Sequence, residues 1–192
     1  MLATGAVHQH LVKRGLRCAC NLLVETGTAR DPHHFACLIG YGATAVYPYM
    51  AYQVLFDMMR KGRVKLDFAT RLELGRSYRA GLRKGLFKIM SKMGISTIGS
   101  YRSSQLFEIV GLADEVVDTC FTGTESRVQG AGFEDLEADA RQLAARAWDP
   151  REPLDQGGLL KYVHGGEYHM YNPYVYMGSE ERRVGKECRS RW

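Results

Sequence analysis

The pattern of apolar and polar positions predicts a helix-rich α/β chain with few, short strands. Apolar residues recur at helical spacing in most segments, so we expect helices at 6–14, 33–39, 51–59, 70–93, 104–110, 114–120 and 133–147. In the first of these, Val7 and Leu11 share the apolar face. The apolar run Asn21–Glu25 fits a short buried strand. The stretch 122–132 is rich in polar residues and glycine, which predicts a loop.

One stretch, Lys84–Arg102, combines the parts from which α/β proteins build ligand sites. The long helix ends in this stretch, and Gly94 can take the left-handed conformation that closes a helix. We expect a short buried strand at 95–98 and a polar loop at 99–103. Because α/β proteins often place ligands on such loops, this is the first place to search for a site.

Three glycines lie inside the long helix, at Gly75, Gly81 and Gly85. In a regular helix each costs about 1 kcal/mol relative to alanine. Either close packing against a neighbouring element or a local break would explain them, and the pattern leaves both explanations open.

The polar end of this stretch holds the candidate binding residues Ser96, Thr97, Ser100 and Arg102. Hydroxyl groups and a guanidinium on one loop are a chemistry that binds an anion. The alternative is helix capping, in which Ser100 or Ser103 would cap the helix expected at 104–110. Capping is the favoured interpretation.

Histidine and cysteine residues suggest a metal site only weakly. His33, His34 and Cys37 lie close in the sequence, with Cys18 and Cys20 upstream. The single residue between Cys18 and Cys20 is not the usual ligand spacing, and the apolar neighbours of Cys37 favour a small core residue. We therefore expect no metal site, and five cysteines in 192 residues do not suggest a disulfide scaffold.

Composition and charge argue against a nucleic-acid-binding protein and against a membrane protein. The net charge is +5, but the last fourteen residues contain five basic and three acidic side chains. Without them, 21 of the 26 basic and 18 of the 21 acidic residues remain, a net charge of +3. That is not the footprint of a nucleic-acid-binding protein. No run is apolar enough to span a membrane, and the N-terminus lacks a secretory pattern, so we expect a cytoplasmic protein with neither nucleic-acid nor membrane partners.

The C-terminal segment Ser179–Trp192 has neither a helical nor a strand period. It closely resembles the read-through translation of a sequencing-library adapter, so we expect it not to be native and exclude it from the fold, as one would exclude a tag. A genuine basic tail is the alternative. The adapter interpretation implies that the chain is a fragment of a longer protein, in which Met1 need not be the true start.

Long stretches of the chain carry a family resemblance. The segments Glu25–Ala43 (ETGTARDPHHFACLIGYGA), Lys84–Tyr101 and Leu159–Pro173 closely resemble the large subunit of bacterial glutamate synthases of the NADPH type, and the likeness extends over essentially all of residues 2–178. It resembles the region where the central α/β domain gives way to a (β/α)8 FMN-binding barrel. The resemblance thus implies a division into 1–92, the end of the central domain, and 93–178, the lead-in to the flavin domain.

The resemblance implies an oxidoreductase of glutamate biosynthesis and ammonia assimilation. Enzymes of this family make two glutamates from glutamine and 2-oxoglutarate. Ammonia released from glutamine reaches an FMN site through an internal tunnel, and the imine formed there is reduced by the flavin. Electrons come through a 3Fe–4S cluster, either from NADPH by way of a FAD-containing small subunit or from ferredoxin.

The family's catalytic and cofactor residues have no counterpart in this chain. By the resemblance, the catalytic N-terminal cysteine lies upstream of Met1, and the flavin-binding segments and cluster cysteines lie downstream of Gly178. We therefore expect no catalytic, metal or cofactor residue here, an architectural role, and no activity of this piece alone. The alternative is a free-standing α/β interaction module that binds an acidic partner through the basic helix 83–92.

Overall fold

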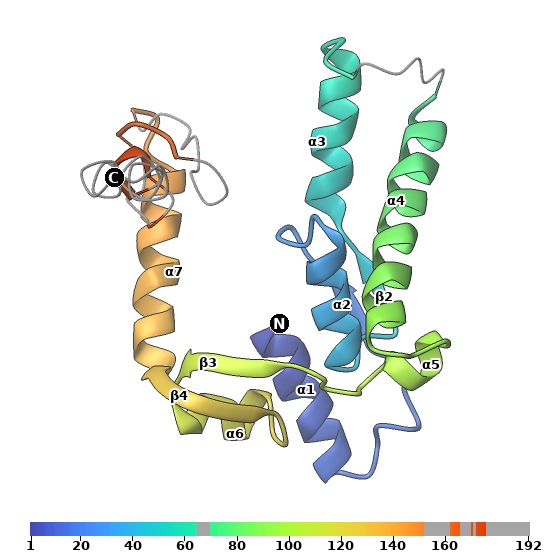
Figure 1. Cartoon of the computed structure of the whole chain (residues 1–192), viewed down its shortest axis with the longest axis vertical. Helices are drawn as coiled ribbons and strands as arrows, with labels where there is room; N and C mark the ends of the chain where they lie inside the picture. The colour runs from blue at the N-terminus through green and yellow to red at the C-terminus, as the bar shows by residue number, and fades with distance from the viewer. Residues whose placement is uncertain (65–69, 152–161, 166–169, 171, 176–192) are drawn as a thin grey trace, which may run out of the picture. The chain divides into compact units, whose positions relative to one another are not determined.

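The structure is a computed structural model that describes residues 1–64, 70–151, 162–165, 170 and 172–175 (Figure 1). Its helices are α1 Leu2–Lys13, α2 Pro32–Gly40, α3 Tyr49–Arg60, α4 Arg71–Lys92, α5 Ile98–Tyr101, α6 Asp114–Cys120 and α7 Phe133–Ala147. Its strands are β1 Leu23–Glu25, β2 Ala45–Tyr47, β3 Glu108–Leu112 and β4 Glu125–Ala131. The chain divides into two units, 1–137 and 138–192.

The strands of the first unit form two separate parallel pairs, each built from one strand–helix–strand segment. β1 pairs with β2 and α2 connects them, with Val24 opposite Val46. β3 pairs with β4 and α6 connects them, with Ile109 opposite Ser126. Parallel neighbours need a crossover connection, which a helix commonly supplies. The expected helix-rich α/β fold is confirmed.

Three clusters of buried side chains hold these elements together. One joins α2, α4 and the first strand pair and includes Phe35, Leu38 and Leu82. A second places Met90 and Tyr101 against α2. The third joins α6 to strand β3 and to α1. Helix α4 therefore contributes to two of the three clusters, and it also contacts α3 along the helix pair seen in Figure 1.

Helix α4 runs without a break through all three of its glycines. Thr70 caps its N-terminus in a capping box with Glu73, which fixes the start predicted from the pattern. A Cβ atom on Gly85 would collide with the ring of Pro32, the first residue of α2. Around Gly81, by contrast, there is open space. Close packing thus explains Gly85, and no local break occurs.

Helix α1 buries a polar face rather than the apolar face that its sequence predicts. Val7 is exposed, whereas the buried residues are Thr4, Gly5, His8 and Gln9. Gly5 lies against the backbone of Cys120 in α6, where a Cβ would collide. The close approach of α1 to α6 therefore sets which face of α1 is buried, and Leu2 and Ala6 pack against the cluster around α6.

Several elements differ from those that the pattern predicts. The expected helix at 104–110 is wrong, because this stretch leads into strand β3, where Val110 is 67% exposed. The expected loop at 122–132 contains strand β4, and strand β2 was not predicted. The strand expected at 95–98 is also wrong, because Ile98 is exposed and begins α5, a helical turn that replaces part of the polar loop.

The second unit begins within α7. This helix, expected from its amphipathic pattern, buries none of its residues. After it, Asn172 is buried, and its side-chain oxygen accepts hydrogen bonds from the backbone N–H groups of Tyr174 and Val175. The segment Leu159–Pro173, which carries part of the family resemblance, falls mostly outside the described residues, and the adapter-like segment 179–192 falls wholly outside them.

Candidate functional site

The candidate anion-binding loop forms an exposed turn around α5. Ser96, Thr97, Ser100 and Arg102 are all exposed. The hydroxyl oxygens of Thr97 and Ser100 are hydrogen-bonded to each other at 2.8 Å. The structure thus brings Thr97 and Ser100 together, and each already satisfies part of the other's hydrogen-bonding capacity. The assignment of these residues to an anion site stays a prediction.

The capping interpretation of the same loop is wrong. From residue 104 the chain leads into strand β3, so Ser100 and Ser103 have no directly following helix to cap. Ser103 instead takes a left-handed conformation, with φ of 62°. Its N–H donates to the carbonyl of Ile39 at 3.1 Å, and the N–H of Gln105 donates to that of Gly40 at 3.2 Å. These bonds tie the loop to the end of α2, whose last carbonyls need partners.

Tyr101, in the middle of this loop, is fully buried. Its ring lies among apolar side chains, and its hydroxyl has no hydrogen-bond partner among the described residues. Burial, and to a lesser extent the neighbouring Cys37, raise the pKa of Tyr101 to about 12. Tyr101 therefore stays protonated at neutral pH and serves as a core residue.

The cysteine and histidine candidates are engaged in local structure. The Asp31 carboxylate accepts from the backbone N–H groups of His33 and His34 and so caps α2. Burial, and then the Asp31 carboxylate, raise the pKa of the Cys37 thiol, which disfavours the thiolate that a metal requires. In the part of the chain that the structure describes, no three potential ligand side chains gather at one point.

A buried polar contact that the sequence did not indicate links α1 to the end of α2. Arg17 donates from Nε to Nδ1 of His8 at 2.9 Å and from its terminal nitrogens to the carbonyls of Cys20 and Gly42. Burial, and then the Arg17 charge, lower the pKa of His8. Three hydrogen bonds from one guanidinium hold a loop in place, so this cluster has a structural role.

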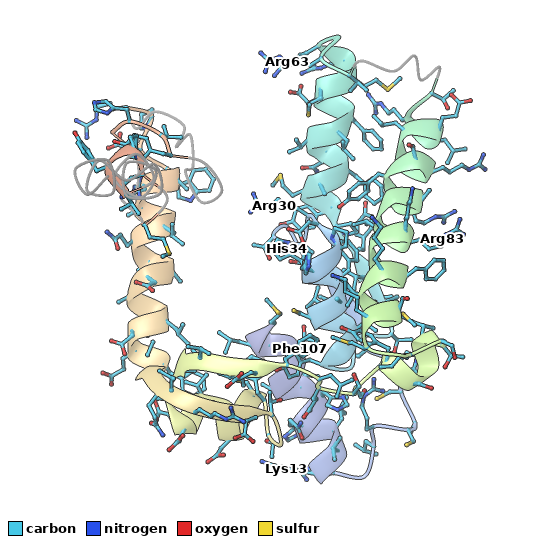
Figure 2. The ribbon with its side chains drawn as sticks, viewed as in Figure 1. Lys13, Arg30, His34, Arg63, Arg83 and Phe107 are labelled. Atoms are coloured by element: carbon cyan, nitrogen blue, oxygen red, sulfur yellow. The ribbon has the colours of Figure 1, made fainter. Side chains whose placement is uncertain are left out.

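The most prominent surface feature lies along one side of α4. Five residues, here called the α4 stripe, recur at helical spacing and are all exposed: Leu72, Arg76, Arg79, Arg83 and Phe87. Figure 2 shows Arg83 on the side of α4 that faces away from α2. The basic helix 83–92 noted in the sequence includes Arg83 but not Arg76 and Arg79, although their helical spacing was the available signal.

The surface is hollowed at three places along the α4 stripe. At the α3 end, a groove of about 430 Å³ is lined by Tyr52, Phe56, Arg76 and Arg79. In the middle, the arginines themselves line a depression of about 200 Å³. Beyond Phe87, a third hollow of about 390 Å³ includes Ser96 from the polar loop. Aromatic walls and guanidinium groups suit the binding of anionic partners.

Ser126 does not have the surroundings of a nucleophile. The hydroxyl of Ser126 is buried without a hydrogen-bond partner in the described chain, so no base activates it. The same part of the chain contains no helix that is both long and apolar enough to cross a bilayer.

Comparisons with known proteins identify the chain's relatives. The family described as "Glutamate synthase central domain" matches residues 1–113. The chain is 42% identical over 184 residues to the ferredoxin-dependent glutamate synthase of Cyanidium caldarium, covering 90% of this chain and 12% of the relative. It is 40% identical over 175 residues to the glutamate synthase [NADPH] large chain of Bacillus subtilis, covering 90% and 11%.

A relative from yeast is also a glutamate synthase. The glutamate synthase [NADH] of Saccharomyces cerevisiae is 42% identical over 175 residues, which cover 88% of this chain and 8% of the relative. The chain thus spans about a tenth of the length of the curated relatives that it matches. These matches confirm the resemblance inferred from the residue segments.

Proposed function

Because the chain belongs to the glutamate synthase central-domain family, we propose that it is an architectural segment of a glutamate synthase large subunit. In that role it joins the end of the central domain to the flavin domain and supports the conversion of glutamine and 2-oxoglutarate into two glutamates. We expect the piece to be inactive alone, because by the family resemblance the catalytic and cofactor residues lie in other parts of the large subunit.

The single observation that carries this proposal is the family match over residues 1–113, together with about 40% identity across 90% of the chain. The described surface agrees with a supporting role, since it offers hollows and exposed apolar side chains rather than a catalytic set. Neither the match nor the relatives favour the free-standing interaction module. The division at residues 92 and 93 stays part of the proposal.

The family's cofactors do not fit the described residues. An iron–sulfur cluster needs several cysteine thiolates at one point. Cys18, Cys20, Cys37 and Cys120 do not form a ligand group, and burial raises the pKa of the Cys37 and Cys120 thiols. The hydroxyls of the loop around α5 are exposed and partly bonded to each other, which does not make a flavin pocket. We propose that FMN and the iron–sulfur cluster are bound by other segments of the parent, the complete glutamate synthase large subunit to which this segment belongs.

The finer properties of the parent follow from the same proposal. The rest of the large subunit is the immediate partner, and a small subunit that carries FAD supplies electrons from NADPH. The names of the relatives include ferredoxin-dependent, NADPH and NADH enzymes, so the electron donor rests on the resemblance to the bacterial type. The cytoplasm is the proposed location.

Segment exchange in a complete enzyme tests this function. The 175 matched residues of the Bacillus subtilis large chain are replaced by those of this chain, and the chimera is assembled with the small subunit. We expect it to form glutamate from glutamine and 2-oxoglutarate. The chain alone, assayed in parallel, should form none and bind no FMN.

Two results would contradict the proposal. One is a folded chimera that holds FMN yet makes no glutamate while the unexchanged enzyme does. The other is tight FMN binding by the isolated chain, which would place a cofactor site within this segment.

A further inference from the structure

We propose that the α4 stripe is a docking surface for another segment of the same large subunit, one with carboxylates at its centre and apolar side chains at both ends. The inference rests on the proposed function, since the partner segment belongs to the parent chain. Nothing in the matches assigns a role to this face of α4.

The first argument is the order of side chains along the stripe. Leu72 is 63% exposed and Phe87 is 60% exposed, and the three arginines lie between them. If water alone covered this face, large apolar residues at both ends of the three arginines would gain nothing. Apolar ends around a charged centre favour a partner with the complementary order.

The second argument is the lack of compensating charge. Within the described residues, no carboxylate lies within ion-pair distance of Arg76, Arg79 or Arg83, whereas Arg60 and Arg127 do have acidic partners. Three like charges at helical spacing repel one another. An acidic segment laid along the stripe would remove this repulsion and form charge-assisted hydrogen bonds.

The third argument is shape. The hollows at the two ends lie beside the apolar residues of the stripe, and the one at the α3 end has an aromatic wall that includes Tyr52 and Phe56. Arg71 lies over the Phe56 ring at 5.7 Å and continues the cationic edge. Apolar side chains of the partner can fill these hollows, which is how anchor residues stabilise an interface.

The size of the parent indicates where this partner comes from. The curated relatives are about eight times as long as this chain, because the matched residues make up only 11–12% of most of them. A segment joined covalently to this one has a high effective concentration, so even a small surface can bind it. We therefore commit to a segment of the same large subunit rather than to a separate protein.

Arginine footprinting of the chimera described above tests the docking. Phenylglyoxal is applied to the active chimera and to the isolated chain, and modification of each arginine is followed by mass spectrometry. We expect Arg76, Arg79 and Arg83 to react at least about tenfold more slowly in the chimera, because an interface that excludes water protects them. Equal reactivity in the two proteins would overturn the proposal.

Charge reversal supplies a matched control on the same helix. The variant Arg76→Glu, Arg79→Glu, Arg83→Glu should shorten the half-time of thermal inactivation of the chimera by about tenfold, while the stability of the isolated chain changes little. The control Lys84→Glu, Lys88→Glu, Lys92→Glu carries the same charge change off the stripe and should have little effect. Equal losses in both variants, or a loss in the isolated chain, would contradict the proposal.

Sedimentation of the isolated chain tests whether a second copy of this chain, rather than another segment of the large subunit, covers the α4 stripe. A dimer that the stripe reversal dissociates would show that a second copy covers the face, which would overturn docking by another segment. Because the chimera's glutamate synthesis is measured first, failure of the docking proposal is separable from failure of the proposed function.

Discussion

Replacing Gly81 and Gly85 of α4 separately by alanine tests whether close packing fixes the path of this helix. The two residues share one helix and one turn's separation, and they differ in what a new Cβ would meet. At Gly81 it would meet open space, and at Gly85 it would collide with the ring of Pro32. Both substitutions change helix propensity by the same amount, so a difference between them reports the contact with Pro32.

The expected energies have opposite signs. An alanine in a helix interior is more favourable than glycine by about 0.5–1 kcal/mol, so Gly81→Ala should raise the free energy of unfolding by that amount. Gly85→Ala has the same gain, but overpacking costs about 1–3 kcal/mol. We therefore expect the two variants to differ in free energy of unfolding by about 1–3 kcal/mol, with Gly85→Ala the less stable.

The cost at Gly85 depends on Pro32 being unable to move away. Pro32 is the first residue of α2, and the Asp31 cap holds it in place. The hydroxyl of Tyr78, on α4, donates to the carbonyl of Arg30 at 2.7 Å and fixes the distance between the two helices. Urea denaturation followed by circular dichroism measures the difference through the transition midpoint at constant slope. Equal midpoints for the two variants would refute the packing argument.

Two further variants test the buried polar groups of the first unit. Because burial lowers the pKa of His8 below its ordinary 6.5, the stability from neutral His8 is complete above that pH and is lost as the pH falls through the folded-state value. His8→Gln keeps an acceptor for Arg17, so the fall in melting temperature between pH 7 and pH 5 should be smaller than in the unmodified chain, and an equal fall would rule out this cause. Tyr101→Phe removes a buried hydroxyl without a described partner, so the free energy of unfolding should stay level or rise by up to about 1–3 kcal/mol in urea titrations. A loss of more than about 1 kcal/mol would show that the hydroxyl is bonded.

The helices were predictable because their signals are local. The capping box at Thr70 and the turn at Gly94, whose φ is 71°, both lie within a few residues of the ends that they set. The same holds for Asp31 and Pro32 at the start of α2. Local signals of this kind are fully present in the sequence, so the positions of α2 and α4 could be predicted closely.

The second strand pair could not be predicted, because pairing partners create it. β4 is exposed along most of its length and has few apolar residues, so its sequence has no strand period. Leu106, Phe107, Ile109 and Val110 fit a helical spacing, yet Gln105 has a positive φ of 52° and the chain enters β3. Hydrogen bonding between β3 and β4, across the intervening helix, decides the outcome for both segments.

The tertiary contacts around the candidate residues could not be predicted for a related reason. The loop residues Ser96 to Arg102 attracted attention because they are polar and adjacent, whereas the structure leaves them on an exposed turn. The role of His8 depends on Arg17, which approaches it only when the loop after α1 folds back. Such contacts arise from tertiary structure and leave no spacing in the sequence.

The sequence pattern of helix α4 does not show which of its faces another segment covers. Leu74, Leu82 and Met90 are buried and pack α4 against its neighbours, yet Leu72 and Phe87 on the same helix stay exposed. A surface helix with one covered face concentrates its apolar residues there, while a helix covered on both sides has apolar residues on both. By this criterion the exposed Leu72 and Phe87 mark a part of α4 that a partner segment can cover. The arginines between its two outer apolar residues then restrict what can cover it to a segment that brings negative charge.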